Sequence, residues 1–411
     1  MKFNRLISIT LLSMASGAIA ADAAVQPHQA PTATAEEAKI IHWRVPQISH
    51  TFWDIAPLEQ PFTTSAPAQL QDGIATGVLG QDGGDKTLIS RLASEIADKQ
   101  HGEVDSLLIS HKGKLLFESY YLRGRIDLPH PQSSATKTYT SLAIGRAIQL
   151  GYLSLADLDK PVLSFLQGLD QTKFVAGIDN ITLHQAMTMR SGLKFSADRI
   201  RQYGSQPGRY YGIKRLQAFF EDSEAVTKQS QTFNYQGPNP DIVMQVLDAV
   251  VPGSAQDFIK QQLFGKLGIV NYDWRTEQDG VPTAGAFASL TSRDMLKLGS
   301  LVLNNGNWQG EQLIPAAFIS QATAGHVELS DEQVQNFYAG ASLSNSAYGY
   351  FWWQTAMQLA DKQYRSISAQ GGGGITILLV AELDLLVVVT GHARQAYLQM
   401  IAEKVLPAFV P

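Results

Sequence analysis

Hydrophobic positions recur at two different spacings along this chain. Leu88, Ile89, Leu92 and Ile96 follow one another at intervals of three or four residues, which predicts one amphipathic helix. No repeat of fixed period is visible in the rest of the chain.

Two pairs of apolar runs predict β-hairpins near opposite ends of the chain. The first covers residues 105–121 (DSLLISHKGKLLFESYY) and turns at 111–114, and the second covers 375–391 (ITILLVAELDLLVVVTG) and turns at 381–384. The sequence between the hairpins has a predominantly helical pattern. We therefore predict an α+β fold: an antiparallel sheet built from both chain ends and flanked by helices, with a mostly helical second region.

The N-terminus has the pattern of an export signal. Lys2 and Arg5 precede an apolar run at 6–14, and small residues stand at Ala18 and Ala20, which predicts cleavage after Ala20. The alternatives are a buried helix or a membrane anchor, but the apolar run is shorter than the roughly 20 residues that span a bilayer. We expect a periplasmic or secreted bacterial protein with no stable membrane insertion after cleavage.

Four segments follow from these patterns. Residues 1–20 are the predicted signal peptide, and residues 21–40, rich in Ala, Pro and Thr, are predicted to be flexible. Residues 41–104 form a predicted N-terminal extension packed on the body. The main domain is expected at 105–411, with its helical insertion at about 150–330.

Composition excludes several function classes. The 411 residues are 45% hydrophobic and 17% charged, with a net charge of -5, so nothing favours nucleic-acid binding. The chain has no cysteine, which excludes disulfides, thiol nucleophiles and thiolate metal sites.

Two Ser-x-x-Lys matches occur, and their contexts differ. Ser134 and Lys137 stand at the start of an apolar-periodic run, so both can lie on one face of a helix. Ser191 and Lys194 surround a Gly-containing turn and have no reason to meet. A buried lysine at a helix N-terminus shifts toward its neutral, basic form and can accept the serine proton. The alternative is that the serine caps a helix and the lysine is solvated.

Two further segments carry candidate chemistry. Tyr235 precedes a Gly-Pro-Asn turn that opens another helix, and a phenol near a lysine can shuttle a proton; the alternative is a buried aromatic residue. Four glycines at 371–374 enter the strand of the second hairpin, where free backbone N–H groups can approach a ligand, unless they form a flexible loop.

Together, these three elements resemble the serine β-lactamase and penicillin-binding-protein superfamily. The resemblance is to class C-like serine hydrolases, which include esterases and 6-aminohexanoate-oligomer hydrolases. It extends from about residue 105 to the C-terminus and includes the segments DNITLHQAMTMRSGL, AGAFASLTSRDMLKLGS and YGYFWW. It implies the fold predicted above and catalysis through an acyl-enzyme.

The resemblance also implies roles for single residues. Ser134 is the expected nucleophile, Lys137 its proton acceptor and Tyr235 the proton relay. The expected oxyanion hole consists of the backbone N–H groups of Ser134 and Gly374, with Gly373 as the alternative to Gly374. No cofactor is implied.

The chain departs from the family pattern at two places that bear on substrate. Gly237 replaces the asparagine that usually follows the tyrosine by two residues, and Asn239 is the candidate to replace its amide. The third motif, Gly371, Gly372 and Gly373, lacks the usual cationic residue, which normally meets a substrate carboxylate. We therefore expect a small ester or a short amino-acid oligomer amide as substrate.

Aromatic residues are candidates to line the substrate pocket. Tyr203 and Trp352 are the two that we select, although core packing explains the tryptophan equally well.

Other functions are weighed against this one. No Gly-x-Ser-x-Gly motif supports an α/β-hydrolase, and the nine histidines form no His-Glu-x-x-His motif, so no metal is predicted. His130 is expected to be a loop residue that orders the turn before Ser134. The remaining alternatives are a penicillin-binding protein, a D-Ala-D-Ala carboxypeptidase or β-lactamase, and a non-catalytic peptidoglycan-binding relative. The oligomeric state is not predicted.

Overall fold

A large, mainly antiparallel sheet forms the centre of the computed structural model, which describes residues 29–41, 51–206, 208–334, 340–392 and 397–410. The strand order is β1-β4-β3-β15-β14-β13-β12-β11-β10, and β2 pairs in parallel with β4. The strands are β1 (Phe62–Thr64), β2 (Ala75–Thr76), β3 (Val104–His111), β4 (Lys114–Tyr120), β10 (Val327–Glu328), β11 (Leu343–Tyr348), β12 (Trp353–Leu359), β13 (Lys362–Gly371), β14 (Ile375–Val380) and β15 (Leu385–Gly391).

Both predicted hairpins are confirmed and meet in this sheet. The first is β3–β4, whose turn places Lys112 and Gly113 at positive φ. The second is β14–β15, and β15 pairs with β3, with Val387 opposite Ile109. Strands β3, β14 and β15 are buried along their whole length. The two chain ends therefore form one sheet, as expected for the α+β fold.

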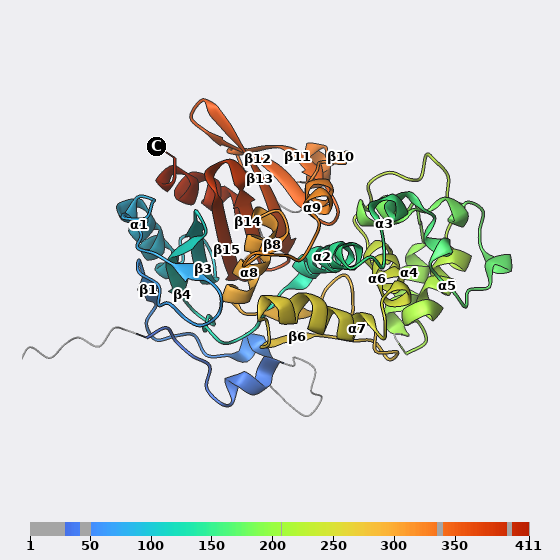
Figure 1. Cartoon of the computed structure of the whole chain (residues 1–411), viewed down its shortest axis with the longest axis horizontal. Coiled ribbons are helices and arrows are strands. Elements are labelled where there is room, and N and C mark those ends of the chain that lie inside the picture. Colours follow the sequence, from blue (N-terminus) through green and yellow to red (C-terminus); the bar gives the residue numbers. More distant parts are fainter. Residues whose placement is uncertain (1–28, 42–50, 207, 335–339, 393–396, 411) are drawn as a thin grey trace, which may run out of the picture.

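The helices gather on the sheet and beside it (Figure 1). They are α1 (Lys86–Ala97), α2 (Thr136–Gln149), α3 (Leu183–Met187), α4 (Ala197–Ser205), α5 (Gly212–Asp222), α6 (Pro238–Val250), α7 (Ala255–Phe258), α8 (Ser292–Leu303), α9 (Ala316–Ala322), α10 (Asp331–Val334) and α11 (Leu398–Met400). Two small sheets join them: β5 (His130–Pro131), β6 (Tyr272–Trp274) and β7 (Ala288–Leu290) form one, and β8 (Asn307–Trp308) and β9 (Glu311–Gln312) form the other. None of the described helices is long and apolar enough to span a bilayer.

Helix α1 confirms the predicted amphipathic helix. Asp85 caps it by accepting hydrogen bonds from the amides of Thr87 and Leu88. Ile89 and Ile96 are buried, and α1 packs against the helical turn η11 (Ile401–Val405). The apolar face of α1 thus packs against a helical turn from the C-terminal end of the chain.

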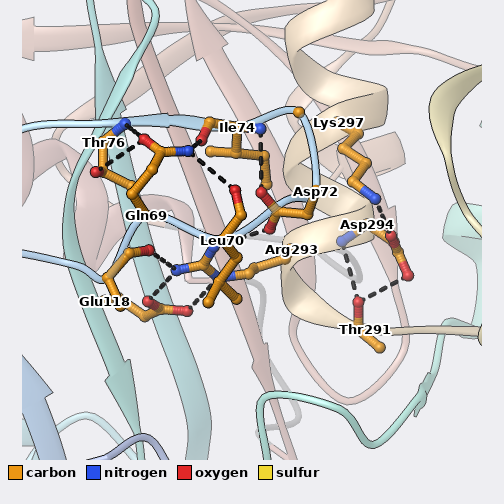
Figure 2. A network of polar contacts seen from close by, with 12 residues as sticks. Gln69, Leu70, Asp72, Ile74, Thr76, Glu118, Thr291, Arg293, Asp294 and Lys297 are labelled. Carbon is orange, nitrogen blue, oxygen red and sulfur yellow. Dashed lines mark hydrogen bonds and ion pairs between the residues drawn. The ribbon is translucent and has the colours of Figure 1, made fainter.

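Helix α8 packs on β15, β14 and β3 and is tied to the sheet by a buried arginine. The Arg293 guanidinium donates two hydrogen bonds to the Glu118 carboxylate, at 2.8 and 2.7 Å, and a third to Asp72 at 2.8 Å (Figure 2). Both Arg293 and Glu118 are buried. A bidentate pair of this kind fixes orientation as well as distance, so it locks α8 against β4.

The N-terminal segments lie on this body as far as the structure describes them. Within the segment predicted to be flexible, Glu37 pairs with Arg125 at 2.9 Å and the Ala33 amide donates to Asp127, so residues 29–41 contact the main body. Strand β1 joins the main sheet next to β4. The predicted signal peptide and its cleavage site lie outside the described residues, so export stays a prediction, as do the segment boundaries.

Helix α2 connects the sheet with the helical region (Figure 1). It contacts α6, and the single turn before it, η3 (Ser133–Ala135), contacts β13 and β14. The N-terminus of α2 is therefore the point at which elements of both regions converge.

Candidate active site

Ser134 lies at a sharp junction between β5 and α2. It is the middle residue of η3, and the residue before it, Ser133, has a φ of 46°. A non-glycine residue in this left-handed region is strained, and such strain is typical of functional positions. The Thr136 hydroxyl donates to the Ser133 carbonyl at 2.7 Å and helps to hold the turn.

Lys137 is brought to Ser134, as the helical spacing predicted. Its Nζ lies 3.0 Å from Ser134 Oγ and 2.7 Å from the carbonyl oxygen of Gly285. The lysine is buried, with 6% of its surface exposed. A neutral amine can donate one hydrogen to the Gly285 carbonyl and accept the Ser134 hydroxyl hydrogen with its lone pair. The arrangement is thus compatible with proton transfer from the serine to the lysine.

The pKa of Lys137 is shifted toward neutrality. Burial lowers this pKa to about 8, because the charged ammonium loses its hydration, and the nearby Asp241 carboxylate opposes the shift. A substantial fraction of the lysine is therefore uncharged just above neutral pH.

Tyr235 completes a three-residue cluster. It immediately precedes the Gln236-Gly237 step into α6, and its hydroxyl forms a hydrogen bond with the Ser134 side chain. Lys137 Nζ lies 4.9 Å from the centre of its ring. Burial raises the pKa of Tyr235 to about 12, so the phenol keeps its proton at neutral pH.

The glycine run forms the turn between β13 and β14, not the start of a strand. The Gly374 amide donates to the Gly371 carbonyl at 3.2 Å, and Gly373 has a φ of 90°, the conformation of a type II turn. The prediction of Gly374 as an oxyanion donor is therefore wrong, because its N–H closes the turn. A Cβ on Gly374 would also lie 2.4 Å from the Tyr397 ring.

The same turn approaches the serine closely on its other side. A Cβ on Gly371 would lie 2.2 Å from the Gln132 carbonyl oxygen, and one on Gly372 would lie 3.9 Å from Ser133 Cβ. Within the described part of the chain, the amides of Ser134 and Gly372 donate to no carbonyl of another element or loop. Gly372 therefore replaces Gly374 as the candidate partner of the Ser134 amide in an oxyanion hole.

Asn239 does not face the cluster, which corrects its prediction as a substrate-binding residue. Its side chain is fully buried. Its Oδ1 accepts from the Ser191 amide at 3.3 Å, and its Nδ2 donates to the Asn234 carbonyl at 3.4 Å. The amide is occupied in joining α6 to the loop around Ser191.

The two predicted aromatic pocket residues also have other partners. Trp352 is 1% exposed and belongs to the core. The Tyr203 hydroxyl donates to Asp222 at 3.0 Å, and its ring packs on Tyr210 and Phe219 at centroid distances of 5.0 and 5.1 Å. These contacts give Trp352 a role in the core and Tyr203 a role in packing the helical region.

The second Ser-x-x-Lys match is confirmed as structural. Ser191 is buried in a loop, where its Oγ accepts from the Leu193 amide at 3.4 Å, and Lys194 is exposed. Ser191 is therefore bonded within its buried loop, whereas Lys194 lies on the surface.

Sequence reasoning missed two groups that surround Lys137. The Gly285 carbonyl is an ordinary backbone group and gives no sequence signal. Asp241 lies on α6 and pairs with Arg215 at 3.3 Å. Burial raises the pKa of Asp241 to about 6, partly opposed by Arg215, so it is ionised above that pH.

Asp241→Asn is expected to shift the acidic limb of the pH–rate profile, on which activity rises as Lys137 loses its proton. The ionised carboxylate stabilises the ammonium form of Lys137, so its removal lowers the lysine pKa below its value of about 8. Hydrolysis rates of an activated ester between pH 5 and 10 should then show kcat/KM reaching its plateau at lower pH than in the unmodified protein.

Glu277→Gln is the matched control for this variant. Glu277 also pairs with Arg215, but it is not among the groups that shift the Lys137 pKa. Its removal should leave the limb in place. An unchanged limb in Asp241→Asn would show that this carboxylate does not tune the lysine.

Comparison with known proteins gives one family and several solved structures of the same fold. The family model described as Beta-lactamase matches residues 89–400. No curated protein is significantly similar to the chain in sequence.

Solved structures share the fold at low sequence identity. EstCE1, a hydrolase with promiscuous acyltransferase activity, is similar with a TM-score of 0.58 and 15% identity, over 78% of this chain and 97% of the other. A class C beta-lactamase has a TM-score of 0.56 and 14% identity, over 79% and 96%. A penicillin binding protein from Bacillus halodurans has a TM-score of 0.55 and 16% identity, over 79% and 100%.

Proposed function

The chain belongs to the Beta-lactamase family, and we propose that it is a serine hydrolase that forms an acyl-enzyme at Ser134. One observation carries this proposal: Ser134 Oγ has hydrogen-bond contacts with both Lys137, at 3.0 Å, and Tyr235. A serine hydroxyl in this position can give its proton to the buried lysine, and the protonated phenol beside it can give a proton to the leaving group.

Acylation begins with Lys137 in its neutral form. Ser134 Oγ attacks the substrate carbonyl carbon while its proton moves to Lys137 Nζ, and the carbonyl oxygen becomes an oxyanion. The amides of Ser134 and Gly372 are the donors that we assign to this oxyanion. Main-chain donors fixed beforehand stabilise the developing charge without reorganisation.

Release of the leaving group needs a proton donor. The protonated Tyr235 hydroxyl passes a proton to the departing alcohol or amine, and the proton held by Lys137 restores the phenol. Water then attacks the acyl carbonyl carbon and gives a proton to the neutral Lys137, the bond between the acyl group and Ser134 Oγ breaks, and Lys137 returns the proton to Ser134 Oγ. The same lysine and tyrosine serve this second half-reaction because they contact the atom that is released.

The substrate that we propose is a small carboxylic ester or short amide without a carboxylate to be bound. Residues 366–374, which lead into and form the glycine turn, include no Lys, Arg or His. The turn at Gly371–Gly373 thus offers backbone groups only. A charged contact is a large part of carboxylate recognition, so its absence disfavours β-lactams and peptides ending in D-alanine.

Turnover of two compounds tests this substrate class. The purified protein should hydrolyse p-nitrophenyl butyrate with steady release of nitrophenol, and it should hydrolyse benzylpenicillin at least about 100-fold less efficiently in kcat/KM, the scale of one lost charge-assisted contact. Efficient penicillin turnover would instead identify a β-lactamase. A lasting penicillin adduct without ester turnover would identify a penicillin-binding protein.

A further inference from the structure

A second cluster of reactive side chains lies apart from the serine. Asp105 in β3, His130 in β5 and His392 directly after β15 converge, with one ligand atom of each within 4.8 Å of the others. His130 Nε2 lies 2.8 Å, and His392 Nε2 lies 2.6 Å, from the same oxygen, Asp105 Oδ2. Asp105 and His130 are 0% and 3% exposed. Folding thus places two imidazoles and one carboxylate around a single buried point.

The contacts of His130 favour a cation at this point. Its Nδ1 lies 3.0 Å from the Pro131 carbonyl oxygen and its Nε2 lies 2.8 Å from Asp105 Oδ2, and both oxygens can only accept a hydrogen bond. A neutral imidazole has one N–H, so in either tautomer one ring nitrogen presents a lone pair to an acceptor oxygen. A metal ion at Nε2 or a second proton on the ring removes this mismatch.

His392 supplies a second nitrogen at the same point. Although its Nε2 is close to Asp105 Oδ2, the ring nitrogen has no aligned hydrogen-bond partner among the described residues. The His392 side chain is only 10% exposed, so solvent has little access to form this hydrogen bond instead. A metal ion close to both His392 Nε2 and Asp105 Oδ2 would give this nitrogen a partner.

We propose that Asp105 Oδ2, His130 Nε2 and His392 Nε2 bind a zinc ion. Two imidazoles and one carboxylate are a ligand set that suits Zn²⁺, with bonds of about 2.0–2.2 Å and one position left for water. To reach tetrahedral spacing, each imidazole nitrogen would move roughly 0.5–0.7 Å away from Asp105 Oδ2.

The surroundings of the cluster have the features of a metal site. The Pro131 carbonyl orients His130, and the Arg123 amide donates to the other Asp105 oxygen at 2.9 Å. The rings of Phe52 and Trp53 pack on His130 and His392 at centroid distances of 4.5 and 4.2 Å. Outer hydrogen bonds and an apolar cover both stabilise bound metal.

The position of the site gives the ion a structural role. His130 stands four residues before Ser134. His392 follows Gly391, whose carbonyl oxygen would lie 3.1 Å from a Cβ on Gly373 in the glycine turn. The ion would therefore brace the serine junction and the turn from behind. The predicted absence of a metal rested on local spacing, which cannot detect ligands that are distant in sequence.

Cobalt and zinc binding test the site without reference to catalysis. Untagged protein, treated with a chelator and dialysed, is titrated with Co²⁺ and followed by visible absorption, and its thermal unfolding is measured with and without Zn²⁺. We expect one tetrahedral Co²⁺ per chain, displaced by Zn²⁺, and a rise in the unfolding midpoint of about 3 °C at a hundredfold excess over the dissociation constant. His392→Ala should abolish the cobalt band, and circular dichroism should show that this variant folds.

His101→Ala is the matched control. His101 Nε2 also contacts a carboxylate, Glu95, at 2.8 Å, but no third ligand is near it among the described residues, so this variant should bind Co²⁺ normally. The proposal is overturned if the unmodified protein gives no cobalt band and no zinc-dependent stabilisation, in which case a second proton on His130 holds the cluster. It is also overturned if His392→Ala binds Co²⁺ as the unmodified protein does.

Discussion

Ser134→Ala is expected to lower kcat/KM for p-nitrophenyl butyrate by about 10⁴-fold or more, the scale seen when a serine nucleophile is removed. The substitution deletes the one oxygen that contacts both Lys137 and Tyr235. Folding should be nearly unchanged, because Ser134 is only partly buried and caps no helix through its side chain. Stopped-flow and steady-state release of nitrophenol measure the loss.

Ser191→Ala is the control that the chain itself provides. Ser191 starts the other Ser-x-x-Lys match, yet its hydroxyl serves only the local loop. Its removal should leave kcat/KM within about twofold, the range of a surface or loop change distant from chemistry. Equal losses in the two variants would contradict the assignment of the nucleophile.

Lys137→Met is expected to lower kcat by about 10³-fold, within the range contributed by a positioned general base. Methionine keeps much of the buried aliphatic stem but has no basic nitrogen, so the Ser134 proton has no acceptor at 3.0 Å. The Gly285 carbonyl also loses its donor. The rate rise through pH 8, where the lysine changes charge, should disappear with it.

Lys194→Met is the matched lysine control. Lys194 is exposed and lies three residues after Ser191, so its substitution should change neither kcat nor the pH profile. If Lys137→Met kept the pH-dependent rise through about 8, another group would have to be the base, whatever the size of the rate loss.

Local patterns were sufficient to predict the sheet and the first contact of the site. The hairpins follow from long apolar runs around polar turns, and they join in one sheet as predicted, through a pairing of β15 with β3 that the patterns did not specify. Residues three apart at a helix start must share a face, so Ser134 and Lys137 meet. Tyr235 was placed beside them only by the family resemblance, because its segment is remote in sequence.

The oxyanion donor could not be predicted because it depends on the type of turn. Four consecutive glycines can adopt several turns, and each would direct a different amide toward Ser134. The bond from the Gly374 amide to the Gly371 carbonyl selects one turn and leaves Gly372 as the candidate. Because all four residues are glycines, no side chain in the sequence indicates which amide faces Ser134.

The direction of a buried polar side chain was equally beyond prediction. Asn239 is close in sequence to Tyr235, but the helical path of α6 turns its amide toward Ser191. The pair of Asp105 and His392 arises from β3 and the end of β15, which lie side by side only after the sheet forms. Register and helix phase, not composition, decide such contacts.

The most direct test of the central claim is intact-mass spectrometry with peptide mapping after reaction with a fluorophosphonate. An activated serine oxygen displaces fluoride from phosphorus and leaves a stable phosphonyl group. We predict one phosphonyl group per chain, located on Ser134, with none added to Ser134→Ala and ester hydrolysis lost in proportion to labelling. A label on another residue, or full ester hydrolysis by the labelled protein, would contradict catalysis through an acyl-enzyme at Ser134.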